Sequence, residues 1–272
     1  MRFRGVRAPV ILVLHNRYRT TGGEERAAAD LLWLLRERLG EDAELLERDS
    51  ARLGRGRAAA GMLRGGRHPD EVAAAVRRTG ARIVHAHNVN PTFGWRALAA
   101  ARAAGARVVL HLHNYRLVCA VGTCFTRGAD CTRCHGRNTL PGVALRCRGS
   151  LAEAVVYAAG LSLWQRRLVE SVDAFVVPSA FALGRLRELG APLGDRGRDL
   201  IGRQPAAQHP GRRPPAAENR RVALEQLDVL AEALARQPQQ VRDGALLAAG
   251  GAVAVVQDED HGSAGAGAGR LT

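Results

Sequence analysis

Hydrophobic residues occur along the chain in short runs typical of buried strands, separated by longer stretches with helical periodicity. Aliphatic and β-branched runs predict five strands, at residues 10–14, 43–47, 82–85, 108–112 and 174–177. Amphipathic stretches predict helices between them, at about residues 24–39, 70–79, 94–104, 151–171 and 180–189. Strands that alternate with helices in this way predict an α/β fold with a doubly wound, Rossmann-like parallel sheet.

This rhythm stops near residue 195. Residues 195–215 contain four of the eleven prolines and show neither a strand period nor a helix period. We therefore expect an α/β domain over residues 1–194, with a cysteine loop at 116–149. We expect residues 195–272 to form an irregular tail that is partly helical or disordered.

The large positive net charge alters the expected binding partners only slightly. The 272 residues carry a formal net charge of +14, and all 40 basic residues are arginine. The arginines are scattered and not interleaved with aromatic residues, which argues against nucleic acid as a partner. An anionic membrane surface or a phosphorylated substrate is favoured instead.

Two features bear on location. The first apolar run is too short for the roughly 7–15 residues of a signal-peptide core, and no run approaches the roughly 18 residues of a membrane span. We therefore expect a cytoplasmic protein, which the arginine-rich helices allow to associate peripherally with the inner face of the membrane.

Two His-x-His-Asn tetrapeptides, at residues 85–88 and 111–114, follow the third and fourth predicted strands. Alternate strand residues face the same side, and the carboxyl ends of neighbouring parallel strands meet at one crevice. A single histidine there is most often a hydrogen-bonded core residue, but two equivalent motifs favour a functional site.

Gly22 and Gly23 precede Glu24 at a predicted helix start, where backbone N–H groups can bind a phosphate. Glycines at such a tight turn also occur without any ligand.

The cysteine loop contains all five cysteines of the chain: Cys119, Cys124, Cys131, Cys134 and Cys147. The Cys-x-x-Cys pair at Cys131 and Cys134, with outlying cysteines, is compatible with a structural zinc site. A disulfide or redox pair is the rival, although an odd number of cysteines and a reducing compartment weigh against it. Plain thiols are the third alternative.

Together these residues resemble the N-terminal domain of family 4 glycosyltransferases, which have the two-domain GT-B architecture. The resemblance covers residues 8–194 and rests on four segments: GGEER at 22–26, RIVHAHNVNP at 82–91, VVLHLHNYRLVC at 108–119 and DAFVVPSAF at 173–181. The chain is similar to a subgroup with the HNYRLVC motif and a following cysteine loop. In this subgroup a tetrad matching Cys119, Cys131, Cys134 and Cys147 recurs, which leaves Cys124 as the extra cysteine.

The resemblance implies transfer of a hexose from a nucleotide sugar to an acceptor hydroxyl with retention. It implies a catalytic role for His113 near the transferred sugar, and contacts with the donor phosphates for Gly22, Gly23 and Glu24. The implied acceptor side consists of His87, Asn88, Asn114, Tyr115 and Arg116, and the acceptor is a glycan, a lipid or a small molecule. No catalytic metal is implied, so zinc on the cysteine tetrad would be structural.

One departure from the family pattern is large. In the family the nucleotide sugar is held mainly by a second Rossmann-like domain with a Glu-x7-Glu motif. Six residues separate Glu218 from Glu225 and Glu225 from Glu232, so the motif is absent from the tail. We therefore expect a truncated or frameshifted glycosyltransferase that lacks the donor domain, and whether it turns over alone is left to experiment. The alternatives are a non-catalytic binding or scaffold module that retains the acceptor crevice and, favoured by charge alone, a zinc-stabilised nucleic-acid-binding protein.

Overall fold

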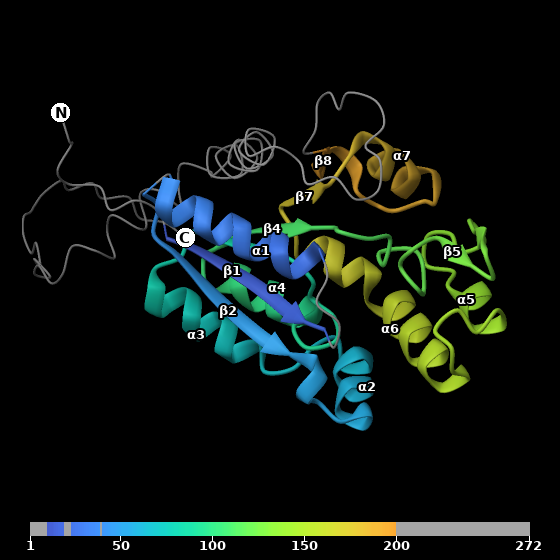
Figure 1. Ribbon diagram of the computed structural model, residues 1–272. Helices are drawn as coiled ribbons and strands as arrows, with labels where there is room; N and C mark the ends of the chain where they lie inside the picture. The colour runs from blue at the N-terminus through green and yellow to red at the C-terminus, as the bar shows by residue number, and fades with distance from the viewer. Residues whose placement is uncertain (1–9, 19–22, 39, 200–272) are drawn as a thin grey trace, which may run out of the picture. The chain divides into compact units, whose positions relative to one another are not determined.

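The structure is a computed structural model that describes residues 10–18, 23–38 and 40–199. A six-stranded parallel sheet forms its centre, in the order β2-β1-β3-β4-β7-β8 (Figure 1). The strands are β1 Ile11–Arg17, β2 Ala43–Asp49, β3 Ile83–Ala86, β4 Arg107–His111, β7 Ala174–Val177 and β8 Gly197–Asp199. The order reverses between β1 and β3, so the sheet is doubly wound as predicted.

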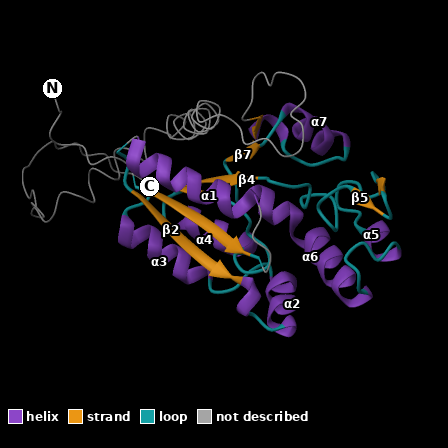
Figure 2. Cartoon of the chain, in the orientation of Figure 1, coloured by secondary structure: helices purple, strands orange, loops and turns teal. Residues whose placement is uncertain are grey.

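Helices cover both faces of this sheet (Figure 2). They are α1 Gly23–Trp33, continued by a π-helical turn at Leu34–Arg38, α2 Arg55–Arg64, α3 Pro69–Thr79, α4 Gly94–Ala103, α5 Leu140–Ala144, α6 Leu151–Glu170 and α7 Ala180–Glu188. Helix α1 packs on the face that carries Ile11 and Val13 of β1. Helices α3, α4 and α7 pack on the opposite face, which carries Leu12 and Leu14.

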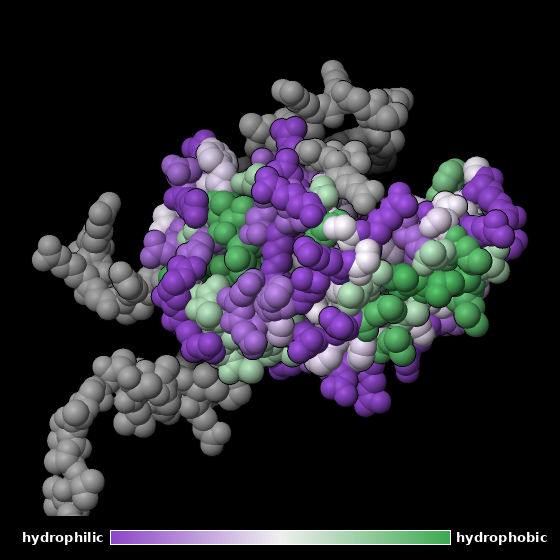
Figure 3. All heavy atoms as spheres, turned by 90° about the horizontal axis from the view of Figure 1, so that it is seen from below, coloured by the Kyte–Doolittle hydropathy of each residue, from purple (hydrophilic) through white to green (hydrophobic). Residues whose placement is uncertain are grey.

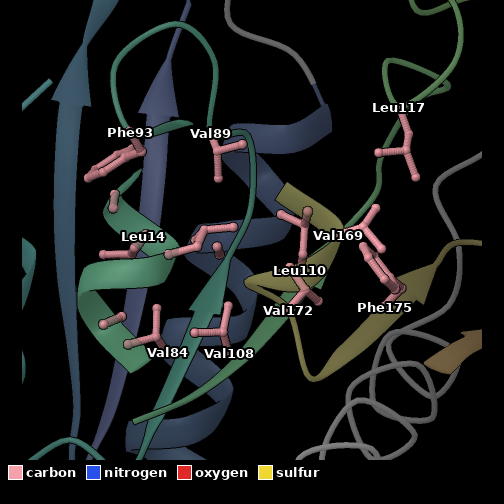
Figure 4. Close-up of a cluster of buried hydrophobic side chains, with 14 of the residues drawn as sticks. Leu14, Val84, Val89, Phe93, Val108, Leu110, Leu117, Val169, Val172 and Phe175 are labelled. Atoms are coloured by element: carbon pink, nitrogen blue, oxygen red, sulfur yellow. The ribbon is translucent and has the colours of Figure 1, made fainter. Parts of the chain in front are cut away.

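The larger hydrophobic core lies on this second face (Figure 4). Leu14 of β1, Val84 of β3 and Leu110 of β4 are almost completely buried there, as is Phe93. Because strand side chains alternate between faces, the intervening residues of the same strands form the core beneath α1. Burial on both faces explains why these strands read as continuous apolar runs.

Glycines set the spacing of the helices around the carboxyl end of the sheet. Gly66 and Gly94 have positive φ angles of 120° and 60°. A Cβ at Gly66 would overlap the carbonyl oxygen of Phe93, and one at Gly94 would overlap the backbone of Gly65. In α6, a Cβ at Gly160 would lie 2.7 Å from Met62 Cγ of α2. These contacts bring α2, α4 and α6 together near the ends of β3 and β4.

Two parts of the predicted organisation differ from the structure. Strand β8 pairs in parallel with β7, although we expected no strand after residue 195, so that expectation was wrong for residues 197–199. An edge strand of three residues is too short to show a hydrophobic period, and its pairing depends on the neighbouring strand. Helix α2 was also not predicted. Residues 200–272, the remainder of the expected tail, lie outside the described residues.

Surface hydropathy is uneven. Figure 3 shows apolar side chains gathered in the region of α5 and α6, where Leu140, Leu151, Val155 and Leu163 are exposed. In the part of the chain that the structure describes, no helix combines the length and hydropathy needed to cross a membrane.

Candidate functional site

Five of the nine histidines lie on one face of the sheet at its carboxyl end. In β1, β3 and β4 the residues Val13, Ile83 and Val109 point toward α1. Strand alternation places the residues two and four positions further along on the same side. These residues are His15, His85, His87, His111 and His113.

The imidazole rings of this histidine cluster are in direct contact. The His111 and His113 rings are stacked with centroids 3.8 Å apart, and the His85 and His87 rings with centroids 4.7 Å apart. His87 Nδ1 and His113 Nε2 lie 2.8 Å apart and share a hydrogen bond. The two His-x-His motifs therefore converge, as predicted from their equivalent positions.

Burial keeps these imidazoles neutral. It lowers the pKa of His85 to about 3 and that of His113 to about 4, with repulsion from neighbouring imidazolium as a smaller cause. Burial also lowers the pKa of His15, His87 and His111. At neutral pH each ring therefore offers one N–H donor and one acceptor nitrogen rather than a positive charge.

Several of these ring nitrogens are buried without a hydrogen-bond partner among the residues that the structure describes. They include both nitrogens of His85, Nε2 of His87 and Nδ1 of His111. An unsatisfied buried polar atom costs roughly 1–3 kcal/mol. A cluster with several such atoms is unusual in a core and is typical of a site that takes a ligand.

A pocket lies next to the cluster at the carboxyl ends of β3 and β4. Its polar lining includes six of the predicted site residues: Glu24, His87, Asn88, His113, Asn114 and Arg116. Its apolar wall comes from α2, α4, α6 and β4 and includes Met62, Trp95, Leu112, Leu161 and Trp164. The site thus combines one polar end with a long apolar side, as ligand pockets commonly do.

A chain of hydrogen bonds connects the start of α1 to the loop after β4. Asn114 Nδ2 donates to Glu24 Oε1 at 2.7 Å, and Asn114 Oδ1 accepts from the backbone N–H of Arg116 at 3.0 Å. Burial raises the pKa of Glu24, and the hydrogen bond from Asn114 partly opposes that rise. Asn114 therefore fixes the positions of both Glu24 and Arg116 at the pocket.

Arg116 is the positive group of the pocket. Its guanidinium lies 4.7 Å from the centre of the Tyr18 ring, and Gly122 packs against its side chain, where a Cβ would lie 2.6 Å from Arg116 Cγ. Burial lowers the pKa of Arg116 to about 10, so it stays charged. Its Nε and Nη1 atoms are buried and have no hydrogen-bond partner within the described part of the chain.

The other predicted site residues have different surroundings. Asn88 uses both ends of its amide internally, because Oδ1 accepts from the Tyr18 hydroxyl at 2.6 Å and Nδ2 donates to the Asn16 carbonyl at 2.8 Å. Tyr115 is not part of the pocket lining and packs against the larger core. Gly23 begins α1, with open space where a Cβ would be, and Gly22 lies outside the described residues.

The cysteine loop folds into two short strands, β5 Phe125–Thr126 and β6 Ala129–Asp130, followed by α5. All five cysteines line one small pocket within it. A hydrogen bond from the Cys124 thiol lowers the pKa of Cys119 to about 5, and the same bond raises the pKa of Cys124. The predicted zinc ligands are thus gathered in one place.

Their sulfur atoms are not arranged as a closed metal site. Among the described residues, the three potential ligand atoms that lie within 4.8 Å of one another belong to His85, His87 and His111. No three of the cysteines form such a group. Zinc at the four cysteines would require the sulfur atoms to approach one another until each lies about 2.3 Å from the ion.

Sequence reasoning missed five residues of this region as site residues. His85 and His111 were recognised as motif members, but only their partners two residues further on were assigned a role. His15 continues the alternation of β1 and could have been found by the same rule. Trp95 and Trp164, whose rings lie 5.7 Å apart, gave no signal, because isolated tryptophans in helices are usual core residues.

These observations define a class of protein: an α/β protein with a ligand pocket at the carboxyl end of a doubly wound parallel sheet. The model of the family described as "Glycosyl transferase 4-like domain" matches residues 46–196, more than half of the chain. The chain belongs to this family, which confirms the predicted resemblance at the level of the family.

The similarities to solved structures are too weak to indicate a fold or a function for this chain. The structure titled "Native KDPGal structure" is 12% identical, with 85% of this chain and 98% of that chain covered, and its TM-score is 0.25. An aspartate aminotransferase from Rhodobacter sphaeroides is 15% identical, with 67% and 48% covered, and its TM-score is 0.27. Both scores are too low to indicate a shared fold. The search of curated proteins found no match.

Proposed function

We propose that this protein transfers a hexose from a nucleotide sugar to an acceptor hydroxyl with retention, and that the pocket beside β3 and β4 takes the acceptor. The observation that carries this proposal is the position of His113. In a chain of the glycosyl transferase 4-like family, it lines a pocket with Asn114 and Arg116 and hydrogen-bonds to His87.

His113 acts in this proposal through hydrogen bonding. With its pKa lowered to about 4, the ring is neutral at pH 7 and cannot balance the charge of a departing diphosphate. Its Nε2 atom is used by His87, so Nδ1 is the nitrogen that contacts the transferred sugar. The departing diphosphate is stabilised instead by backbone N–H groups at the start of α1, around Gly23, and by Arg116.

The pocket lining supports an acceptor with an apolar part. Met62, Trp95 and Trp164 line one side, and the charged end is formed by Glu24 and Arg116. An amphipathic lipid or an aromatic small molecule fits this division better than an extended glycan. The exposed apolar residues of α5 and α6, with many arginines on the chain, support association with a membrane surface that holds such an acceptor.

The test is a transfer assay on the full chain with UDP- and GDP-linked hexoses and an alkyl glycoside as acceptor, read by mass spectrometry. His113→Gln is expected to lower turnover by about a hundredfold or more, a size typical of a group that acts on the reacting atoms. His68→Asn is the matched control, since His68 is exposed and lies outside the cluster. Turnover unchanged by His113→Gln would contradict the role of His113.

Thermal-shift and DNA-binding measurements on the same chain separate the alternatives. Stabilisation by a nucleotide sugar or an alkyl glycoside without turnover would support a binding or scaffold module. DNA binding that weakens steeply with salt, in the absence of stabilisation by either sugar compound, would support the nucleic-acid alternative.

We also propose structural zinc for Cys119, Cys131, Cys134 and Cys147, which line a common pocket. The Cys131→Ser/Cys134→Ser variant should then carry about one zinc per chain less than the wild type, and should melt at a lower temperature. Cys124→Ser is the matched control and should keep the zinc. An unchanged metal content in the double variant would refute this site.

A further inference from the structure

Three buried histidines from adjacent strands bring their ring nitrogens together at the carboxyl end of the sheet. His85 and His87 are two residues apart at the end of β3, and His111 ends the neighbouring strand β4. One nitrogen from each lies within 4.8 Å of the other two, and all three side chains are buried. Parallel strand pairing fixes the backbone of His85 and His111, and the backbone N–H of His87, one residue past β3, donates to the Leu14 carbonyl at 2.8 Å.

Several nitrogens of these three rings are buried and have no hydrogen-bond partner among the described residues. His87 uses Nδ1 in its hydrogen bond with His113, which leaves the buried Nε2 without a partner in the described structure. Nδ1 of His111 and both nitrogens of His85 are likewise buried without a hydrogen-bond partner among the described residues. A second hydrogen bond through the other ring nitrogen is what commonly orients a metal-ligating histidine, and His113 provides it for His87.

We propose that His85, His87 and His111 form a binding site for a divalent transition-metal ion of the zinc class. Imidazole nitrogen is a preferred ligand of zinc, cobalt, nickel and copper ions, and the three rings bring one nitrogen each to within 4.8 Å of the other two. This three-histidine site is separate from the cysteine loop and differs from it in ligand type, nitrogen in place of thiolate.

The groups around the site are compatible with a bound cation. His15 adds a fourth buried ring, whose centroid is 6.4 Å from that of His87. Two carboxylates of the first turn of α1 face the cluster: Glu25 Oε1 lies 3.9 Å from His15 Nε2, and Glu24 lines the adjacent pocket. Negative charge from α1 therefore offsets part of the charge that a divalent ion would bring into the core.

Cobalt(II) is the probe that separates this site from the cysteines. The purified full chain is freed of metal with a chelator and titrated with Co²⁺ alone. Thiolate ligands give an intense near-ultraviolet charge-transfer band, which nitrogen ligands lack. We expect the histidines to bind about one Co²⁺ per chain, which gives visible ligand-field bands without a thiolate band. Any cobalt on the cysteines would be additional and would show the thiolate band. Zn²⁺ should displace the cobalt from the histidines.

Two substitutions and one control assign the ligands. His85→Asn and His111→Asn should each weaken the nitrogen-ligated cobalt by at least about tenfold, because each removes one ligand. His68→Asn removes an exposed imidazole outside the cluster and should change nothing; asparagine suits its positive φ of 43°. Circular dichroism shows whether each variant is folded.

X-ray absorption on the wild type decides the matter even where a variant fails to fold. Three imidazole nitrogens around the cobalt or zinc that the cysteines do not hold would support the three-histidine site. Metal bound through sulfur alone, or nitrogen-ligated metal whose affinity survives both histidine substitutions, would overturn it.

Discussion

The buried histidines predict that the metal-free chain loses stability as the pH falls below about 6.5. In the unfolded chain the imidazoles of His85 and His113 take up protons near the ordinary pKa of 6.5, whereas burial holds their pKa at about 3 and about 4 in the folded chain. The unfolded state therefore binds more protons between these limits. Stability rises with pH over this window, and acidification destabilises the fold.

The size of the effect follows from the two values. At pH 5.5 an unfolded-state imidazole is about nine-tenths protonated while its buried counterpart is neutral, so the two histidines together lower the free energy of unfolding by about 3 kcal/mol relative to pH 8. At pH 4.5 the loss is about 5 kcal/mol. This is comparable with the whole stability of many domains. His15, His87 and His111 add to the loss, because their pKa is also lowered.

Urea unfolding followed by tryptophan fluorescence at pH values from 8 to 4.5 measures this dependence. His85→Leu removes one titrating group and should reduce the slope of stability against pH by about 1.4 kcal/mol per pH unit between about pH 4 and pH 6. His68→Asn is the control and should leave the contribution of the buried cluster intact. An equal pH slope in wild type and His85→Leu would refute the reasoning, because it would mean that His85 titrates alike in both states.

Other predictions concern packing and ion pairs, and urea unfolding checks each of them. Gly160→Val should destabilise by about 1–3 kcal/mol, because the added carbons collide with Met62 of α2, whereas Gly184→Ala in α7 meets nothing within 4 Å and should stabilise by about 0.5–1 kcal/mol. Asp173→Ala should cost about 2–3 kcal/mol, because its carboxylate accepts from the backbone of Val108 and from Arg107. Asp130→Ala removes only an exposed pair with Arg185 and should cost less than about 1 kcal/mol. Equal effects within either pair would contradict the assigned contacts.

The strands β1, β3, β4 and β7 could be predicted because burial on both faces leaves a direct mark in the sequence. Residues 174–177 were predicted with the bounds of β7, since a short apolar run between Asp173 and Pro178 is typical of a buried strand. Helix α2 left no such mark, because Gly56 and Gly61 lower its intrinsic helix propensity. Its packing against Gly160 of α6 is a contact between residues about a hundred positions apart. Such a contact is invisible to local reasoning.

In the site, too, some features could be predicted from the sequence and others depend on the packed structure. The convergence of the two His-x-His motifs followed from strand alternation and parallel pairing, which are general rules. The roles of individual side chains did not follow. Asn88 faces the pocket, but its amide holds Asn16 and Tyr18, and Tyr18 lies 70 positions away in the chain. Hydrogen bonds of this kind depend on the packed structure and not on the residue type, so motif position alone assigned Asn88 to the acceptor.

Arg116 offers a way to tell a residue kept for a ligand from one kept for stability. A buried guanidinium costs desolvation energy, and two of its nitrogens find no partner within the described structure. Replacing such a charge by an apolar chain of similar length is often neutral or stabilising. Arg116→Met keeps the contact of the side-chain stem with Gly122 and loses the contact of the guanidinium with the Tyr18 ring, so its stability to urea should stay within about 1 kcal/mol of that of the wild type.

Binding should respond in the opposite direction. If Arg116 contacts the acceptor or the diphosphate, Arg116→Met should weaken binding of an anionic ligand by roughly tenfold or more, the loss expected for a charge-assisted hydrogen bond. Isothermal titration with a nucleotide sugar and with a phosphorylated alkyl glycoside measures the two cases separately. A stability loss of more than about 2 kcal/mol with unchanged binding would instead make Arg116 a structural residue. A stable variant that binds poorly identifies a charge that the fold tolerates because the ligand requires it.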